Sequence, residues 1–433
     1  MRISVIGCGY LGAVHASAMA VLGHDVVGID VDERKIAQLR AAQPPFFEPG
    51  LAEILANATS SGRLAFSTDI EDAATADVHF IAVGTPQSPG SNFADLTYVD
   101  AAFASLVPHL REGALVVGKS TVPVGTAQRL AALLAARAPH ASLAWNPEFL
   151  REGYAVKDTL EPDRLVYGVG DDHAASVLDD VYRTAIDAGT PRIVTDYATA
   201  ELVKVAANAF LATKISFINA MSEIADATGA DVTALADAIG HDARIGRRFL
   251  NAGVGFGGGC LPKDIRGFTA RADELGLGES LAFLKEVDAI NLRQRQRVVD
   301  LAVGLLDGAP NGKRVVVLGV TFKPESDDVR DSPALDVAVQ LRGLGADVVA
   351  TDPEGIENAR GRHPQLAYVE STDEALRGAE LVLLVTEWRE YRDLDPQRVA
   401  SLVATPRIID GRNVLDPDAW RAAGWVYKGM GRP

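Results

Sequence analysis

Short apolar runs alternate with longer amphipathic stretches through residues 1 to 195. We expect strands at the apolar runs Ile3–Ile6, Asp25–Ile29, Val78–Val83, Leu115–Lys119, Leu143–Trp145 and Leu165–Val169. Because strands that alternate with helices usually form parallel sheets, this region should be an α/β domain with helices covering a parallel sheet.

The first apolar run leads into the sequence Gly7-Cys8-Gly9-Tyr10-Leu11-Gly12, which has the spacing G-x-G-x-x-G. A helical pattern follows to Leu22, and the next strand ends in Asp30. Glycines allow a pyrophosphate to approach a helix N-terminus, where free N–H groups favour anions. An acid at Asp30 can accept hydrogen bonds from ribose hydroxyls and would repel a 2′-phosphate, so the pattern favours NAD over NADP. A structural glycine-rich turn is the alternative.

Three later strands end in turn sequences, namely Gly84-Thr85-Pro86, Ser120–Thr126 and Asn146-Pro147-Glu148. In open α/β sheets, ligands bind beyond the carboxyl ends of the strands. We therefore expect a nicotinamide ring and its substrate to meet at these turns.

The pattern changes to a long helix from Ala198 to about Thr228, and a second helical stretch runs from Leu281 to Leu306. A long helix between two α/β regions has two apolar sides to bury, which suggests a dimer interface. Packing within the same chain is the alternative. The apolar positions along the first helix are Leu202, Val205, Ala209, Ile215 and Ile218.

The last third of the chain repeats the opening pattern without G-x-G-x-x-G. Its expected strands are Lys313–Gly319, Gly345–Asp352, Leu381–Val385 and Arg407–Ile409. The expected fold is α/β, with two Rossmann-like doubly wound sheets joined by a long central helix and a helical dimerisation region. We place the domains at residues 1–196, 197–308 and 309–433.

Composition narrows the class of protein. The chain of 433 residues carries a formal charge of −16, which argues against binding to nucleic acid or to an anionic membrane. Two cysteines exclude a disulfide framework, and no apolar run approaches the length of a membrane span. We expect a cytoplasmic protein.

One of these cysteines, Cys260, lies in Gly255-Phe256-Gly257-Gly258-Gly259-Cys260-Leu261-Pro262-Lys263-Asp264. Glycines let the backbone approach a ligand, and Lys263 can favour the nucleophilic thiolate. A buried, inert cysteine is the alternative.

Together these segments resemble the UDP-glucose/GDP-mannose dehydrogenase family along essentially the whole chain. The matching motifs are Gly7–Gly12, Gly84-Thr85-Pro86, Ser120–Thr126, Asn146–Gly153, Lys204 with Asn208, Gly255–Asp264 and Phe322–Pro333. One departure is Gly259, where many members have serine. The resemblance implies oxidation of a nucleotide sugar's primary alcohol to a carboxylate with two NAD⁺ and no metal. UDP-glucose is the implied substrate, with GDP-mannose or a UDP-N-acetyl-hexosamine as alternatives.

The resemblance also implies roles for individual residues. Catalysis would use Cys260, Lys204, Asp264, Asn208, Thr121 and Glu148. The cofactor would contact Gly7, Gly9, Tyr10, Leu11, Gly12, Asp30, Lys35, Thr85, Thr121, Glu152, Lys263 and Arg330. The substrate would contact Glu148, Phe149, Leu150, Lys204, Asn208, Arg244, Phe249, Leu250, Asn251, Gly257 and Lys323. Arg244 resembles a family arginine that reaches the substrate of the neighbouring subunit, which implies a homodimer with a shared site.

Simpler interpretations of these residues remain. Lys204 can be a solvated helix charge, Thr121 ordinary turn chemistry, and Asp264 part of a surface ion pair. For the whole chain, one alternative is a single-step β-hydroxyacid or 6-phosphogluconate-type dehydrogenase, which would not need Cys260. A non-catalytic nucleotide-binding protein is the other.

Overall fold

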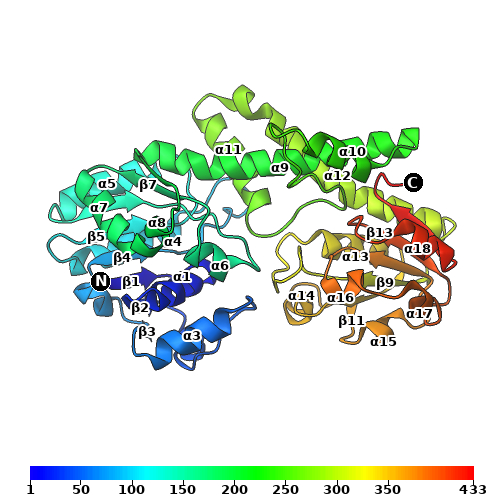
Figure 1. Cartoon of the computed structure of the whole chain (residues 1–433), viewed down its shortest axis with the longest axis horizontal. Helices are drawn as coiled ribbons and strands as arrows, with labels where there is room; N and C mark the ends of the chain where they lie inside the picture. The colour runs from blue at the N-terminus through cyan, green and yellow to red at the C-terminus, as the bar shows by residue number, and fades with distance from the viewer. The chain divides into compact units, whose positions relative to one another are not determined.

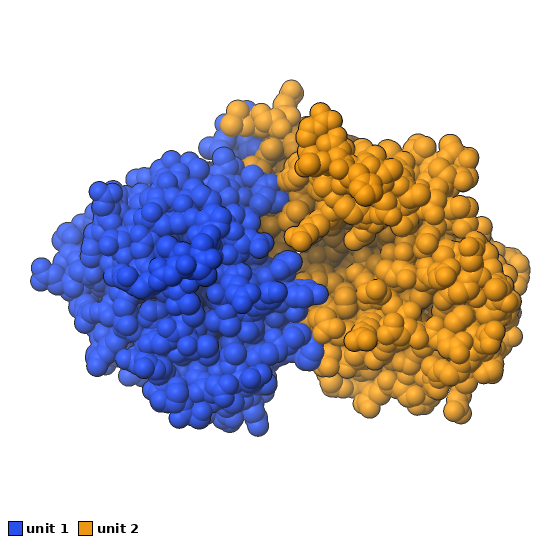
Figure 2. Space-filling view, viewed as in Figure 1, with its two compact units in different colours: residues 1–207, 270–276 blue, residues 208–269, 277–433 orange.

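The computed structural model describes residues 1–433 and divides them into two compact units (Figure 2). The first unit contains residues 1–207 and 270–276, and the second contains residues 208–269 and 277–433. Each unit holds one sheet. None of the helices is both long and apolar enough to cross a membrane. The expected division into three domains stays a prediction.

The first unit is built on an eight-stranded sheet in the order β3-β2-β1-β4-β5-β6-β7-β8 (Figure 1). Its strands are β1 (Arg2–Ile6), β2 (Asp25–Ile29), β3 (Leu64–Ser67), β4 (Val78–Ile81), β5 (Leu115–Gly118), β6 (Ser142–Trp145), β7 (Leu165–Val169) and β8 (Arg192–Thr195). The order reverses direction between β1 and β4, which is the switch point where doubly wound sheets bind their ligands.

The expectation of a purely parallel sheet is wrong at one pairing. Strand β7 runs antiparallel to β6, with Ala144 opposite Val169 and Trp145 opposite Gly168. Antiparallel neighbours enter and leave at the same edge of a sheet. The segment 146–164 therefore leaves β6 and enters β7 at the carboxyl edge of the parallel strands. The only helix within this segment is α6 (Ala155–Leu160).

Helices cover both faces of this sheet because its central strands are buried on both sides. Helices α1 (Tyr10–Val21), α2 (Glu33–Arg40), α3 (Leu51–Ser60) and α7 (Asp172–Val181) contribute to one apolar core. Helices α4 (Thr97–Leu106) and α5 (Thr126–Arg137) contribute to the core on the opposite face. The short helix α8 (Arg183–Asp187) precedes β8.

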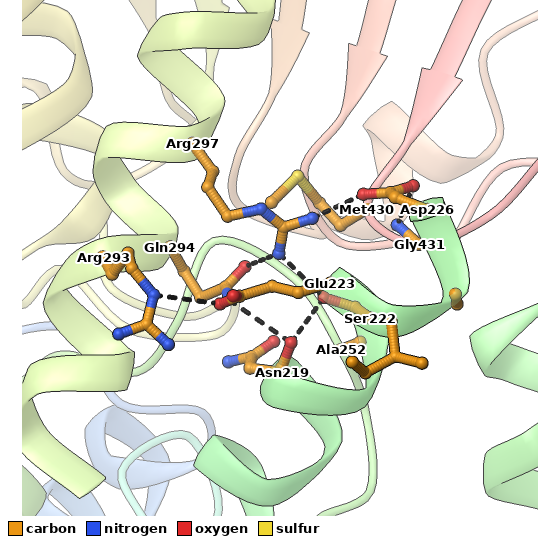
Figure 3. A network of polar contacts seen from close by, with 12 residues as sticks. Asn219, Ser222, Glu223, Asp226, Ala252, Arg293, Gln294, Arg297, Met430 and Gly431 are labelled. Carbon is orange, nitrogen blue, oxygen red and sulfur yellow. Dashed lines mark hydrogen bonds and ion pairs between the residues drawn. The ribbon is translucent and has the colours of Figure 1, made fainter. Parts of the chain in front are cut away.

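The expected long helix is confirmed as α9 (Tyr197–Thr228), which has 32 residues. Helices α10 (Val232–Gly240), α11 (Leu261–Glu274) and α12 (Ala282–Leu305) follow it. Polar side chains join the second half of α9 to α12 (Figure 3). Arg297 donates to Ser222 Oγ at 3.0 Å and to Asp226 Oδ2 at 2.5 Å, and Gln294 donates to Glu223 Oε1 at 3.0 Å.

The second unit contains a fully parallel six-stranded sheet in the order β11-β10-β9-β12-β13-β14. Its strands are β9 (Arg314–Leu318), β10 (Asp347–Thr351), β11 (Ala367–Tyr368), β12 (Leu381–Leu384), β13 (Arg407–Asp410) and β14 (Val426–Gly429). Its remaining helices are α13 (Pro333–Gly343), α14 (Ile356–Arg362), α15 (Thr372–Leu376), α16 (Arg389–Arg392), α17 (Pro396–Ala400) and α18 (Pro417–Ala422). Helices α12 and α13 pack together on one face of this sheet. The expected fold class of two Rossmann-like sheets and a long helix is confirmed.

Candidate active site

The glycine turn after β1 has the geometry that a dinucleotide needs. Gly7 has a φ of +91°, which favours glycine, and a Cβ on Gly12 would lie 1.7 Å from the carbonyl oxygen of Gly7. Helix α1 therefore begins in direct contact with the turn and presents its N-terminal N–H groups there. These features fit a bound pyrophosphate, with Gly9, Tyr10 and Leu11 at the start of the helix.

Asp30 lies beside this turn at the end of β2. Its Oδ2 accepts hydrogen bonds from the backbone N–H of Cys8 and from Lys35 Nζ, both at 2.8 Å. The side chain remains 10% exposed, so Asp30 can take part in the binding of a ribose, with Lys35 next to it. Cys8 itself is buried, and burial followed by the charge of Asp30 raises the pKa of its thiol. Cys8 therefore serves as a packing residue here.

A buried carboxylate that the sequence did not single out connects the glycine turn with the segment after β6. Glu48 accepts hydrogen bonds from the Tyr10 hydroxyl, from Gly153 N at 2.6 Å and from Ala155 N at 2.7 Å. Burial raises the pKa of Glu48. Glu48 thus holds the segment that carries Glu152, which is also buried. Glu48 lies in a loop that contains proline and glycine, and on sequence alone such a loop indicates only a turn.

The turns after β4 and β5 are joined by two hydrogen bonds. Thr85 Oγ1 donates to the carbonyl oxygen of Thr121 at 2.8 Å, and Ser120 Oγ donates to that of Val83 at 2.7 Å. The carboxyl edge of the sheet therefore brings Thr85 and Thr121 together, as the strand pattern predicts.

Glu148 and Lys204 form an ion pair of 2.9 Å, with side chains 14% and 7% exposed. Glu148 Oε2 also accepts a hydrogen bond from Leu150 N at 2.8 Å, which fixes the carboxylate over its own turn. The Phe149 ring lies 5.5 Å from Lys204 Nζ and 3.8 Å from the guanidinium of Arg164. An exposed, solvated Lys204 is therefore excluded.

A second buried cation, Lys119, was missed by the sequence analysis. Its Nζ donates to Asn146 Oδ1 at 2.9 Å and to the Tyr182 hydroxyl at 3.2 Å. Burial lowers the pKa of Lys119 to about 8, opposed by the charge of Glu148 and assisted by that of Lys204. The available signal was a lysine directly after the apolar run Leu115–Gly118.

Lys119 and Glu148 line the same pocket in the first unit. The residues that line it are Leu11, His15, Lys119, Asn146, Pro147, Glu148, Phe149, Leu150, Asp158, Thr159, Pro162, Asp163, Arg164, Leu165 and Tyr182. Burial lowers the pKa of His15 far below its usual value, so this imidazole is neutral.

In the second unit, Cys260 is exposed and directly precedes helix α11. Its carbonyl oxygen accepts the first helical hydrogen bond, from Asp264 N at 3.0 Å, so Cys260 occupies the N-cap position. The free N–H groups and dipole of a helix N-terminus favour a thiolate. The buried alternative for Cys260 is therefore excluded, and its reactivity stays a prediction.

Asp264 is the acid that the structure brings to this helix N-terminus. Its Oδ2 accepts a hydrogen bond from Asn208 Nδ2 at 2.6 Å, and its Oδ1 pairs with Lys263 Nζ at 2.6 Å. The Asp264 side chain is only 3% exposed, so a free surface pair is excluded. On α9, Asn208 lies one turn after Lys204.

The other candidate substrate residues are distributed around this unit. Arg244 is 89% exposed at its side chain and pairs with Asp242 at 2.6 Å. Phe249 has a φ of +67°, Leu250 is buried, and Asn251 accepts a hydrogen bond from Arg247 at 2.8 Å. In the segment after β9, Lys323 lies near the Phe322 ring and Arg330 pairs with Asp328 at 2.6 Å. The structure contains no group of three or more His, Cys, Asp or Glu side chains placed to hold a metal ion.

Comparison with known proteins decides the family. Three models of the UDP-glucose/GDP-mannose dehydrogenase family match the chain: the NAD binding domain at residues 1–186, the central domain at 198–293 and the UDP binding domain at 316–417. The chain belongs to this family. It is therefore an NAD-dependent nucleotide-sugar dehydrogenase, and the expectation of NAD is confirmed.

Relatives match over the full length. A UDP-glucose 6-dehydrogenase of Rhizobium meliloti is 42% identical, and the match covers 100% of this chain and 100% of the relative. A UDP-glucose 6-dehydrogenase of Bacillus subtilis is 40% identical, and the match covers 100% of this chain and 98% of the relative. Among solved structures, a UDP-glucose dehydrogenase of Pyrobaculum islandicum is 42% identical, with a TM-score of 0.91 over 100% of this chain and 98% of that one. A UDP-D-ManNAc dehydrogenase of Pyrococcus horikoshii is 27% identical, with a TM-score of 0.87 over 100% and 99%.

Proposed function

We propose that this dehydrogenase oxidises UDP-glucose to UDP-glucuronate in two steps through a thioester on Cys260. The observation that carries the proposal is the exposed Cys260 at the N-terminus of α11, next to the buried Asp264–Asn208 pair. The UDP-glucose 6-dehydrogenases that are 40% to 42% identical over their full length support the choice of sugar.

The chemistry of a four-electron oxidation explains why a cysteine is needed. When bound, NAD⁺ accepts a hydride in each of the two oxidations. The first oxidation turns the C6 alcohol into an aldehyde, and the hydroxyl proton leaves. The Cys260 thiolate then adds to the aldehyde, forming a C–S bond and a thiohemiacetal that can lose a second hydride to give a thioester. Water adds to the thioester, the C–S bond breaks, and the carboxylate and free thiolate are released with the remaining protons.

Polar groups on α9, α11 and the strand-end turns would serve these steps. Lys204 and Asn208 would stabilise the negative oxygen on C6. Asp264, hydrogen-bonded to Asn208, would take part in proton transfer. Thr121 and Glu148 would position the water that hydrolyses the thioester.

The cofactor would be held mainly by the first unit. The residues that we assign to it are Gly7, Gly9, Tyr10, Leu11, Gly12, Asp30, Lys35, Thr85, Thr121, Glu152, Lys263 and Arg330. The absence of space for a side chain at Gly12 supports this assignment most directly.

The nucleotide sugar would contact a further set of residues. We assign to it Glu148, Phe149, Leu150, Lys204, Asn208, Phe249, Leu250, Asn251, Gly257 and Lys323, with Arg244 from the second subunit of a dimer. The UDP binding domain model over residues 316–417 supports a uridine nucleotide. A UDP-N-acetyl-hexosamine is the second candidate, because the relative from Pyrococcus horikoshii named for UDP-D-ManNAc shares the fold.

A homodimer is part of the proposal. Helix α9 exposes Phe210 (66%), Phe217 (47%) and Ile224 (58%) at intervals of seven residues, which places them along one side of the helix. Such a stripe on a helix is a typical self-association surface. Phe217→Glu should convert the dimer into a monomer in light scattering, whereas Val426→Glu, at another exposed apolar position, should not. A wild type that is monomeric at micromolar concentration would contradict the dimer.

The test of the proposed function is the amount of NADH formed when a limiting amount of UDP-glucose is exhausted. Wild type should form two NADH per sugar, and Cys260→Ser should lose nearly all turnover. One NADH per sugar in the wild type would overturn the two-step mechanism. No NADH from UDP-glucose, with turnover of GDP-mannose or a UDP-N-acetyl-hexosamine, would overturn the choice of substrate alone.

A further inference from the structure

The backbone that leads to Cys260 is held by an asparagine from a distant helix. Asn291 lies in α12 and is fully buried at 0% exposure. Its Oδ1 accepts a hydrogen bond from Phe256 N at 2.7 Å, and its Nδ2 donates to the carbonyl oxygen of Phe256 at 2.9 Å. The oxygen and the nitrogen of one side-chain amide therefore both hold the backbone of Phe256.

The surrounding residues leave this contact little freedom. Gly255 has a φ of +100°, and a Cβ there would lie 2.5 Å from Asn291 Oδ1. Arg412 donates to the carbonyl oxygen of Gly255 at 2.9 Å, and Arg295 donates to that of Phe256 at 3.2 Å. A buried amide with both hydrogen bonds made is costly to remove, because its backbone partners would then be left unsatisfied.

Three glycines connect Phe256 to Cys260, and other groups hold them closely. Gly258 N donates to the carbonyl oxygen of Arg330 at 2.9 Å. A Cβ on Gly257 would lie 2.2 Å from the carbonyl oxygen of Asp331, and one on Gly259 would lie 2.3 Å from the guanidinium carbon of Arg330. Glycine backbone has no intrinsic preference that would restore this path if its start moved. The place of Cys260 at the start of α11 therefore depends on where Phe256 is held.

We propose that Asn291 is a positioning residue that sets the start of the glycine turn and thereby keeps Cys260 at the N-terminus of α11. The expected kinetic consequence rests on the proposed function of Cys260, whereas the expected change in thiol reactivity does not. Nothing in the proposed mechanism requires Asn291 to touch the substrate or the cofactor.

The primary experiment is alkylation of Cys260 by iodoacetamide in the full chain, for wild type and Asn291→Ser. Cys8 is buried and should not react in the folded protein. Because Cys260 is already exposed, a looser turn gains little access but loses the N-terminal position that favours the thiolate. We expect alkylation to slow by about fivefold or more. Affinity for NAD, which we assign mainly to the first unit, should stay within about twofold.

The kinetic readout separates positioning from general loss of structure. A displaced Cys260 should impair the second oxidation more than the first, so aldehyde should escape and be trapped by hydroxylamine, and NADH per sugar should fall below two. Loss of folded protein would lower all activity but leave the ratio at two. If the wild type did not oxidise UDP-glucose, the alkylation experiment would still test the role of Asn291.

Asn219 provides the matched control (Figure 3). It is also fully buried at 0% exposure, lies on α9, and accepts a hydrogen bond from Gly253 N at 2.8 Å in the same segment. Unlike Asn291, it makes only one side-chain contact there, because its Nδ2 has no partner. Asn219→Ser should change the alkylation rate by less than about twofold.

Two results would overturn the proposal. One is an Asn291→Ser protein with wild-type alkylation rate and two NADH per sugar. The other is an equal slowing in Asn219→Ser, which would assign the effect to general loosening of the second unit. If Asn291→Ser does not fold, as judged by circular dichroism, Gly255→Ala serves as the second variant, because it perturbs the same contact from the opposite side. Gly255→Ala should also slow the alkylation of Cys260. A wild-type alkylation rate in Gly255→Ala would contradict the role of Asn291.

Discussion

The two sheets begin in the same way and then diverge at one turn. Each first strand is followed by a glycine with positive φ, Gly7 at +91° and Gly319 at +93°. Each second strand is followed by an acid that accepts a hydrogen bond from the turn, Asp30 from Cys8 N at 2.8 Å and Asp352 from Val320 N at 2.7 Å. The common scaffold therefore includes this carboxylate clamp.

The two clamps differ in how many hydrogen bonds the carboxylate accepts and in how exposed it remains. Asp352 is 3% exposed and accepts hydrogen bonds from five further groups, namely Thr321 N, Thr321 Oγ1, Glu354 N, Gly355 N and Trp388 Nε1. Asp30 keeps part of its surface exposed. In the first sheet the helix starts directly after the turn, whereas in the second α13 begins only at Pro333. The two units therefore differ in the segment after the first strand rather than in the sheet itself.

The largest expected effect comes from breaking the first turn at Gly12. Gly12→Ala places a methyl group 1.7 Å from the Gly7 carbonyl oxygen, where backbone must move. We expect NAD affinity to fall by about 100-fold or more in a fluorescence titration. Gly343→Ala in α13 is the control, since a Cβ there meets nothing within 4 Å. Wild-type affinity in Gly12→Ala would contradict the placement of NAD at this turn.

A smaller effect is expected at the two acids, on stability at Asp352 and on NAD binding at Asp30. Asp352→Asn removes a buried carboxylate whose oxygens accept several N–H and O–H groups, and it introduces an NH₂ that cannot accept. The free energy of unfolding of the second unit, measured by urea denaturation, should fall by about 2–4 kcal/mol. Asp30→Asn should instead weaken NAD binding with a loss of about 1 kcal/mol in stability or less. Equal destabilisation by both changes would remove the distinction between the two clamps.

The sequence was sufficient for the features that depend on local pattern. The two sheets, the long helix and the turns at the strand ends followed from hydrophobic periodicity and glycine positions. The direction of β7 did not, because hydrophobic alternation is the same for parallel and antiparallel strands. Glu48, Lys119 and Asn291 were also missed, since their importance comes from partners at least 27 residues away in the chain. The roles assigned to Cys260 and its neighbours stay predictions.

The sheets also differ in the cation that follows an equivalent strand. Strand β5 in the first sheet and β13 in the second occupy the same place in the strand order. Lys119 after β5 donates to two neutral groups, Asn146 Oδ1 and the Tyr182 hydroxyl. Arg412 after β13 instead pairs with Glu387 at 3.2 Å. The first sheet therefore buries a charge without a direct anionic partner, which is unfavourable for stability.

A pH-dependent effect on stability, smaller than the one expected at Asp352, follows from this difference. Burial lowers the pKa of Lys119 from 10.5 to about 8, so the folded state disfavours the ammonium ion. Between about pH 8 and pH 10.5 the unfolded chain therefore holds more protons than the folded one. The contribution of Lys119 to stability rises with pH through this window and is lost as pH falls through about 8. Lys119→Met removes this dependence.

Relative to Lys119→Met, the wild type should therefore gain about 1–3 kcal/mol of unfolding free energy between pH 7 and pH 10, measured by urea denaturation at each pH. Comparing the two proteins at the same pH cancels the titration of all other groups. Arg412→Met is the matched control, because a guanidinium stays charged throughout this range and its difference from wild type should not change with pH. If the difference in unfolding free energy between Lys119→Met and wild type also did not change with pH, Lys119 would remain fully charged in the fold. The contrast between the two sheets would then be limited to the glycine turn and the acid clamp.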